Sequence, residues 1–288
     1  MAKTTMLIAD SGSTKTGWCL LEGSSQQRIK TQGISPYFLN ADQIKAVLAE
    51  ELIPQLACTA DTVTHVFFYG TGLSAPANAQ QMETLLKGCF PAAAVSVYHD
   101  LMGAARALCQ REKGLACILG TGSGACYYDG VQIVKSSPGL GFILGDEGSG
   151  AYMGKMLVQR YLYGTLDNGL AAAFEARYQP TKADILQRVY QGAFPNRYLA
   201  EFARFLGAHR GEVAAEEIIK TGIRDFLTQH VAPYVQRKDV PVHFVGGIAD
   251  AFQDVVTRLS VRQGFRPGRI LSKPMDGLIT YHNPETGI

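Results

Sequence analysis

Two short segments combine glycine with hydroxyl-bearing residues between apolar runs, a composition that suits phosphate binding. In the first, Asp10 opens the sequence Asp-Ser-Gly-Ser-Thr-Lys-Thr, which ends at Thr16. The apolar residues on both sides predict a β-hairpin whose turn is this segment. A turn of Gly, Ser and Thr presents several backbone N–H groups and hydroxyls to one point, as a polyphosphate requires. Taken alone, the segment is equally well explained as a tight hairpin turn without a ligand.

The same pattern returns further along the chain. Residues 115–119 are apolar, residues 120–124 are Gly-Thr-Gly-Ser-Gly, and residues 125–128 are apolar again. A repeat at this long period predicts two homologous α/β domains rather than a solenoid. The recurrence favours ligand binding over a purely structural role for both turns.

The elements around the first turn predict where a reactive carboxylate lies. Helical periodicity over 41–56 and 79–87 alternates with strand patterns over 62–69 and 94–99, which predicts an α/β fold. Asp100 directly follows the last of these strands, and ligands of α/β sheets gather at the carboxyl ends of strands. A second role for Asp100, compatible with the first, is as the N-cap of the following helix.

A charged turn at 112–114 predicts the domain boundary, with a first domain over 1–112 and a second over 113–288. Between residue 152 and a strand over 242–245, the second domain has mostly helical patterns, including segments near 182–190 and 213–235.

Composition narrows the class of protein. The 288 residues are 47% hydrophobic and 18% charged, which is enough for a sizeable core. The 27 Lys and Arg and the 25 Asp and Glu form no long block of one sign, so we expect neither nucleic acid nor a membrane surface as a partner, but a small molecule. The uncharged stretch 114–128 contains four glycines and is too short to span a bilayer. The segment that starts at Met1 has no secretory signal pattern, so a cytoplasmic location is expected.

Several common cofactor motifs are missing from the sequence. The six cysteines include no Cys-x-x-Cys pair and the six histidines no His-x-x-x-His pair, so neither a zinc site nor a redox couple is predicted. Gly154-Lys155 is followed by Met156, which excludes a P-loop. No Gly-x-Gly-x-x-Gly follows a predicted strand, which argues against a dinucleotide-binding domain.

Four segments together resemble a known family. Residues 8–17 resemble the first phosphate loop of the superfamily that joins sugar kinases, actin and the heat-shock chaperones, and residues 118–124 resemble its second phosphate loop. Residues 244–249 (Phe-Val-Gly-Gly-Ile-Ala) resemble its adenosine loop, and residues 145–149 (Gly-Asp-Glu-Gly-Ser) the signature of N-acetylglucosamine kinases. The chain is therefore similar to the N-acetylglucosamine kinase-like family, which is grouped with the activator ATPases of 2-hydroxyacyl-CoA dehydratases.

This resemblance implies a fold and a reaction. The fold would be two ribonuclease H-like (actin-like ATPase) domains with a nucleotide cleft between them, and a C-terminal helix at about 275–288 packed on the first. The reaction would be ATP- and Mg²⁺-dependent phosphorylation of an amino sugar, N-acetylglucosamine to its 6-phosphate above all, and the family's habit suggests a homodimer. Asp100 would be the general base, and Asp10 would hold Mg²⁺ largely through waters. The nucleotide-binding residues would be Asp10, Gly12, Ser13, Thr14, Lys15, Thr121, Gly122, Gly246 and Gly247; the sugar-binding residues would be Asp100, Ser123, Gly139, Leu140 and Asp146.

The sequence departs from this family at three sugar-side positions. Ser-Pro-Tyr at 35–37, with Pro36 at its centre, stands where the family has an asparagine that reads the sugar. Leu140 replaces a tryptophan, and Gly124 replaces an asparagine. These changes leave the identity of the sugar open, whereas the nucleotide-side motifs are intact.

Two other functions remain as alternatives. An activator ATPase would need well-placed exposed cysteines for an iron–sulfur cluster, and Cys117 and Cys126 lie within or beside apolar hairpin strands. A nucleotide-dependent sugar sensor without turnover would not need a base, so the presence of Asp100 argues against it.

Overall fold

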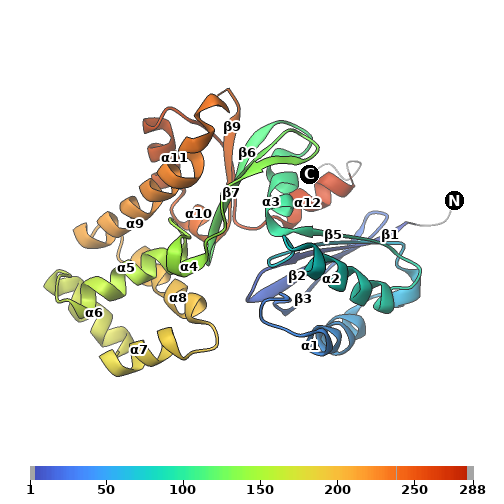
Figure 1. Cartoon of the computed structure of the whole chain (residues 1–288), viewed down its shortest axis with the longest axis horizontal. Helices are drawn as coiled ribbons and strands as arrows, with labels where there is room; N and C mark the ends of the chain where they lie inside the picture. Colours follow the sequence, from blue (N-terminus) through green and yellow to red (C-terminus); the bar gives the residue numbers. More distant parts are fainter. Residues whose placement is uncertain (1–3, 238, 284–288) are drawn as a thin grey trace. The chain divides into compact units, whose positions relative to one another are not determined.

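The computed structural model describes residues 4–237 and 239–283. They fall into two compact units, drawn in Figure 1. Unit 1 contains residues 4–111 and 274–283, and unit 2 contains the described residues of 112–273. We propose these units as the two domains expected over 1–112 and 113–288, with the C-terminal helix counted in the first. Residues 1–3, part of the segment in which no secretory signal is expected, lie outside the described residues.

Unit 1 is built on a five-stranded mixed sheet. Its strands lie in the order β3 (Ser25–Gln32), β2 (Lys15–Glu22), β1 (Thr5–Ser11), β4 (His65–Gly70) and β5 (Ala94–His99). The first three are antiparallel, and β1, β4 and β5 run parallel to one another. The parallel strands therefore bring their carboxyl ends to one edge of the sheet.

Both faces of this sheet are covered by helices, as Figure 1 shows. Leu7 and Ala9 point to the face packed against α1 (Ala41–Ala46), its π-helical continuation η1 (Val47–Leu52) and α2 (Pro76–Cys89). Ile8, between them, points to the opposite face, which is covered by α3 (Asp100–Cys109) and α12 (Met275–His282). This alternation along β1 is what a strand buried on both faces produces. The short turns η2 (Ile53–Gln55) and η3 (Ala60–Thr62) complete the connection to β4.

The C-terminal helix α12 is held in unit 1 by close packing and by a buried polar group. A Cβ at Gly277 would lie 2.3 Å from the carbonyl oxygen of Ala107, so α12 and α3 touch backbone to backbone. The Tyr69 hydroxyl lies 2.8 Å from Nε2 of His282 and accepts a 2.7 Å hydrogen bond from Arg106. The helix expected at about 275–288 is thus present as Met275–His282, while residues 284–288 lie outside the described residues.

Unit 2 repeats the sheet of unit 1. Its strands lie in the order β8 (Ile133–Ser136), β7 (Ser123–Tyr128), β6 (Gly114–Leu119), β9 (Pro241–Val245) and β10 (Arg266–Leu271). The first three are again antiparallel, and β6, β9 and β10 are again parallel. The same order and directions confirm the predicted α/β fold with two ribonuclease H-like domains.

Helices make up most of the rest of unit 2. Phe174 of α6 (Asn168–Tyr178) packs on Phe202 and Phe205 of α8 (Pro195–Ala208), with ring centroids 5.3 Å apart in both pairs. None of the helices among the described residues is long and apolar enough to cross a membrane. The helical segments are α4 (Gly141–Leu144), α5 (Gly150–Leu162), α6 (Asn168–Tyr178), α7 (Lys182–Tyr190), α8 (Pro195–Ala208), α9 (Val213–Phe226), the π-helical turn η4 (Leu227–Val231), η5 (Ala232–Arg237), α10 (Gly247–Ala251) and α11 (Gln253–Arg262).

Candidate active site

The first glycine-rich segment is a short turn between β1 and β2. Strand β1 continues through Ser11 and β2 begins at Lys15, so the turn itself contains Gly12, Ser13 and Thr14. The Gly12 N–H donates to the Lys15 carbonyl at 3.1 Å. Asp10, expected to open the loop, instead lies inside β1, where its neighbours fix its position.

Two buried hydroxyls hold the base of this turn. The Ser11 and Thr16 hydroxyl oxygens lie 2.7 Å apart, and both accept a hydrogen bond from the Ile34 N–H. Ser11 also donates to the Ile34 carbonyl at 2.8 Å. Because these bonds are buried, they restrain the turn and orient its N–H groups in the absence of a ligand.

Gly33 packs against this turn and was not identified from the sequence as a site residue. Its N–H donates to the Thr14 carbonyl at 3.1 Å. A Cβ at Gly33 would lie 2.5 Å from the Gly12 carbonyl oxygen and 2.6 Å from the Ser13 carbonyl, closer than atoms can approach. Gly33 is isolated in the sequence from the glycine cluster that it supports, so only the sheet pairing shows its role.

The carboxyl edge of the unit 1 sheet brings three oxygen-bearing side chains together. Asp10 lies near the end of β1, Thr71 directly follows β4, and Asp100 directly follows β5. The Asp100 carboxylate accepts the Thr71 hydroxyl, and its Oδ1 accepts the Leu101 N–H at 2.9 Å. The N-cap position of α3 belongs to His99, so Asp100 is the first residue of the helix. Thr71 is a further residue that sequence reasoning missed.

The two carboxyl groups at this edge, Asp10 and Asp100, both have raised pKa values. The pKa of Asp10 is raised from 3.8 to about 7, chiefly by burial and then by the negative charge of Asp100, while Lys15 opposes the rise. Burial also raises the pKa of Asp100, which its hydrogen bonds from Leu101 and Thr71 partly offset. Two nearby carboxylates in a poorly solvated site favour a cation or a shared proton.

The donor chemistry fits Mg²⁺. Carboxylate and water oxygens are its preferred ligands, and it takes few of them from protein. Among the described residues, no three His, Cys, Asp or Glu side chains converge on a point that could hold a metal. That Asp10 would hold the ion, with waters and phosphate oxygens as its other ligands, stays a prediction.

The second glycine-rich turn, in unit 2, is fixed by a helix. The Gly120 N–H donates to the Gly122 carbonyl at 3.0 Å. The carbonyls of Gly120 and Thr121 accept hydrogen bonds of 2.8 and 3.1 Å from Gly150 and Ala151, the first two residues of α5. The first N–H groups of α5, which have no partner within the helix, therefore donate to the carbonyls of this turn and hold it in place.

Asp146 lies directly against this turn. Its backbone has a φ of 55°, in the left-handed region that few residues other than glycine adopt. Its Oδ1 accepts the Ser123 N–H at 3.3 Å, and a Cβ at Gly122 would lie 3.0 Å from its Oδ2. Burial raises the pKa of Asp146. The structure thus brings together three of the predicted residues, Gly122, Ser123 and Asp146.

Glu147, the next residue, has contacts that the sequence did not suggest. Its backbone carbonyl accepts the Ser123 hydroxyl at 2.7 Å. Its carboxylate Oε2 lies 2.8 Å from Nε2 of His230, which comes from η4 and is buried. No motif signals this pair, because the two residues are far apart in the sequence.

The remaining predicted residues are more dispersed. Gly246 has a φ of 126°, and a Cβ there would lie 2.2 Å from the Leu119 carbonyl oxygen, so packing requires this glycine with or without a nucleotide. Gly247 begins α10, is exposed and has open space around it. Leu140 is 55% exposed and its Cβ lies against Gly145, next to Asp146, whereas a Cβ at Gly139 would meet nothing.

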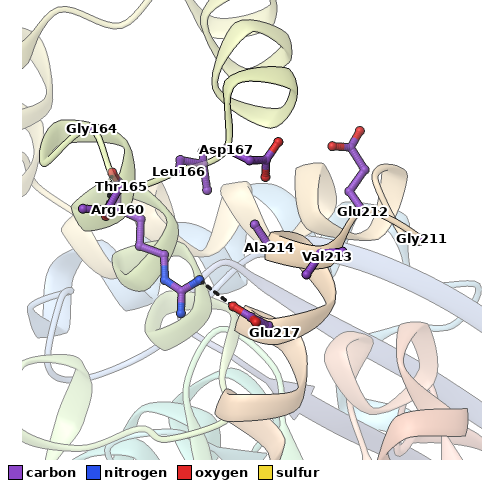
Figure 2. Close-up of a pocket in the computed structure, with 10 residues that line it drawn as sticks. All are labelled: Arg160, Gly164, Thr165, Leu166, Asp167, Gly211, Glu212, Val213, Ala214 and Glu217. Carbon is purple, nitrogen blue, oxygen red and sulfur yellow. Dashed lines mark hydrogen bonds and ion pairs between the residues drawn. The ribbon is translucent and has the colours of Figure 1, made fainter.

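A surface pocket in unit 2 lies away from all these residues. Figure 2 shows it between the end of α5 and the start of α9, with Arg160 and Glu217 3.4 Å apart on its wall. None of the predicted site residues lines it. The lining residues are Arg160, Gly164, Thr165, Leu166, Asp167, Gly211, Glu212, Val213, Ala214 and Glu217.

Comparison with solved structures gives three informative neighbours. A protein from Porphyromonas gingivalis, named a putative N-acetylglucosamine kinase, matches with a TM-score of 0.93 and 40% identity over 97% of this chain and 99% of that one. A putative N-acetylglucosamine kinase from Chromobacterium violaceum matches with a TM-score of 0.74 and 18% identity over 98% and 99%. The ethanolamine utilization protein EutJ from Carboxydothermus hydrogenoformans matches with a TM-score of 0.54 and 12% identity over 94% and 86%.

The last two comparisons show a shared fold only, because their sequence identities are low. No protein-family model and no curated protein sequence matches the chain. The first comparison goes further, since 40% identity extends over nearly the whole of both chains. The chain therefore belongs to the N-acetylglucosamine kinase-like family of actin-like ATPases.

Proposed function

We propose that the protein is an ATP-dependent sugar kinase that phosphorylates a hydroxyl of an amino sugar, with the 6-hydroxyl of N-acetylglucosamine as the first substrate to test. The name of the Porphyromonas gingivalis neighbour, which is 40% identical to this chain, supports this reaction class. The observation that carries the proposal is the pair of carboxylates, Asp10 and Asp100, at the sheet edge beside the Gly12–Thr14 turn.

Asp100 is proposed as the general base. As the sugar oxygen bonds to the γ-phosphorus and the bond to the leaving ADP oxygen breaks, the hydroxyl proton passes to the Asp100 carboxylate. Burial raises the pKa of this carboxyl and makes it a stronger base than an exposed aspartate. Hydrogen bonds from Leu101 and Thr71 fix its orientation, which is the main protein contribution expected in phosphoryl transfer.

The two turns are proposed as phosphate-binding elements. In unit 1, the Gly12–Thr14 turn with Lys15 would bind phosphate oxygens, and Asp10 would hold Mg²⁺, which when bound neutralises phosphate charge. In unit 2, Thr121 and Gly122 are proposed to bind phosphate oxygens, and the open surface at Gly247 to accept the nucleoside. Asp146, with Ser123 beside it, is proposed to accept hydrogen bonds from sugar hydroxyls.

The cysteine geometry disfavours the activator ATPase alternative. Cys117 and Cys126 are both buried in the unit 2 sheet. Cys117 pairs with Ala125 and Cys126 with Ala116 on the neighbouring strand. Paired residues share a face and successive residues alternate, so the two sulfurs point to opposite faces of the sheet. They offer no exposed ligand pair for an iron–sulfur cluster.

Release of ADP from MgATP is the direct test of this proposal. The assay compares hexoses, N-acetylhexosamines and anhydro sugars with a sugar-free control, for the wild type and for Asp100→Asn. We expect sugar-dependent ADP release that the substitution lowers by about 10²- to 10⁴-fold. ATP hydrolysis that does not depend on added sugar would point to an activator ATPase. Binding of sugar without ADP release would point to a sensor.

The Gly33→Ala substitution tests the unit 1 turn as a nucleotide site. The added Cβ cannot fit against the Gly12 and Ser13 carbonyls, so the turn must shift. A shift of about 1 Å at such a site can lower the rate roughly 10²-fold, and we expect a loss of that size in kcat/KM for MgATP.

Gly88→Ala is the matched control, because Gly88 is exposed on α2 with open space at its Cβ position. It should keep wild-type kinetics and gain up to about 1 kcal/mol of stability from helix propensity. Wild-type kinetics in a folded Gly33→Ala protein, judged by circular dichroism, would remove the turn from the proposed site.

A further inference from the structure

The end of helix α9 holds the turn that carries Asp146. Gly222, Phe226 and His230 are spaced four residues apart along α9 and η4. A Cβ at Gly148 would lie 2.6 Å from Phe226 Cβ and 3.2 Å from the Gly222 carbonyl oxygen. His230 stacks on Phe226 with ring centroids 5.0 Å apart and reaches Glu147. One face of this helix end therefore contacts the turn at both residues that follow Asp146.

The turn needs such support, because its backbone is unusual. Asp146 has a φ of 55° and Gly148 a φ of 74°, with Glu147 between them. A left-handed conformation costs a residue other than glycine roughly 1 kcal/mol or more, and it persists only where the surroundings fix it. The surroundings that fix Asp146 include the bonds made by its neighbour Glu147.

Glu147 is held by two separate hydrogen bonds. Its carbonyl accepts the Ser123 hydroxyl at 2.7 Å, and its carboxylate lies 2.8 Å from His230 Nε2. Nδ1 of His230 is buried and has no hydrogen-bond partner among residues 4–237 and 239–283. The imidazole thus makes a single hydrogen bond, in which Nε2–H donates to the carboxylate. A side chain with one donor at the same place would reproduce it.

We infer that His230 is a positioning residue for sugar binding: by holding the Glu147 carboxylate it keeps Asp146 in its left-handed conformation, with the Asp146 carboxylate against Gly122 and Ser123. His230 acts through Glu147 and touches neither sugar nor nucleotide. His230 lies in the π-helical turn η4, and such turns are often found at functional sites. This inference rests on the proposed function, in which Asp146 binds the sugar.

The kinetics of His230→Leu and His230→Gln distinguish a positioning role of His230 from a general role in stabilising the fold. Leucine keeps apolar volume but removes the donor, whereas the glutamine amide offers N–H near the former Nε2. We expect His230→Leu to lower kcat/KM for sugar about 10- to 100-fold, mainly through KM, and to leave KM for MgATP within about threefold. His230→Gln should recover most of the loss. Gln229→Ala, exposed on the same turn, is the control and should behave as wild type.

Amide hydrogen exchange over residues 145–149 gives a readout that needs no substrate. The Ser149 N–H donates to the Asp146 carbonyl at 3.0 Å, so its protection reports the turn. We expect faster exchange in His230→Leu and in Glu147→Ala, which removes the same bond from the partly exposed partner, and wild-type exchange in His230→Gln and Gln229→Ala.

Wild-type exchange over 145–149 in both His230→Leu and Glu147→Ala would overturn the inference. So would an unchanged KM and kcat for sugar in His230→Leu while the wild type is active. If the wild type itself phosphorylates no sugar, the proposed function fails, and exchange alone decides whether His230 positions the turn.

Discussion

Replacement of Asp100 by asparagine is expected to lower kcat by about 10²- to 10⁴-fold, the range that general base catalysis contributes. The amide oxygen of asparagine can still accept the Leu101 N–H, and the Thr71 hydroxyl can bond to either the oxygen or the nitrogen of the amide, so the side chain should keep its place. It cannot accept the proton of the sugar hydroxyl. Since Asp100 is not proposed to bind the phosphates, KM for MgATP should change by less than about threefold.

A purely structural Asp100 would give a different result. Its position as the first residue of α3 favours its negative charge by roughly 0.3–1 kcal/mol, whereas burial, which raises its pKa, disfavours that charge. A substitution that acted through these interactions alone would change the melting temperature without lowering kcat. The matched control is Asp42→Asn, which removes an exposed carboxylate from the first turn of α1. Asp100→Asn with wild-type kcat, whatever its stability, would remove Asp100 from the mechanism.

Several elements of the fold were predictable from their apolar patterns. The strand expected over 94–99 is β5 (Ala94–His99), and the helix expected over 182–190 is α7 (Lys182–Tyr190). Of the four strands at the sheet edges, β5 was predicted, whereas β3, β8 and β10 were not. Of the eight residues of β3, only Ile29 and Thr31 are buried, so its sequence has too few apolar residues to indicate a strand.

Long helical patterns were predicted as single helices, although the structure divides them. The segment expected over 213–235 is α9 (Val213–Phe226), followed by the π-helical turn η4 and the 3₁₀ turn η5. The segment expected over 41–56 likewise changes from α1 to η1 and η2. Hydrophobic periodicity is read over windows of about 11 to 18 residues, so it does not mark where a helix changes to a single π-helical or 3₁₀ turn.

Residues of the candidate site were predictable only where a motif or a strand end marked them. Asp10, Asp100 and Asp146 lie in such places. Gly33 and His230 act through contacts with segments remote in sequence, so no local pattern distinguishes them from other glycines and histidines. Thr71 had a weak signal, since it stands between Gly70 and Gly72 directly after a predicted strand. Gly246 was attributed to ligand approach, and the structure adds a packing requirement for glycine at that position.

Asp10→Asn is expected to stabilise the protein without Mg²⁺ while impairing its use of MgATP. The pKa of Asp10 is about 7 in the folded protein and 3.8 in the unfolded chain, so the folded state binds this proton more tightly. Its ionisation therefore destabilises the fold, progressively as pH rises from about 4 to 7 and fully above 7. Asparagine carries no charge and removes that cost.

The size of the effect follows from the pKa shift. A rise from 3.8 to about 7 corresponds to roughly 4 kcal/mol at about 1.36 kcal/mol per unit. Asp10 is partly exposed, and screening by water reduces the value, so we expect the free energy of unfolding at pH 8 to increase by about 1–3 kcal/mol. At pH 4 the two proteins should differ little, because the carboxyl is then largely protonated in the folded state.

Urea unfolding at pH 4, 6 and 8 without divalent ions measures this difference, and kinetics at varied Mg²⁺ concentration measure the accompanying loss. Asp129→Asn is the control: backbone N–H groups of Gln132 and Val131 lower the pKa of Asp129, so its replacement should not stabilise the protein at pH 8. An Asp10→Asn protein that is less stable than wild type at pH 8 would show that the Asp10 charge is favourably solvated. Unchanged Mg²⁺ dependence would separately reject the metal assignment. A gain in stability together with a loss of MgATP use would show that the Asp10 charge destabilises the fold and is needed to bind a cation.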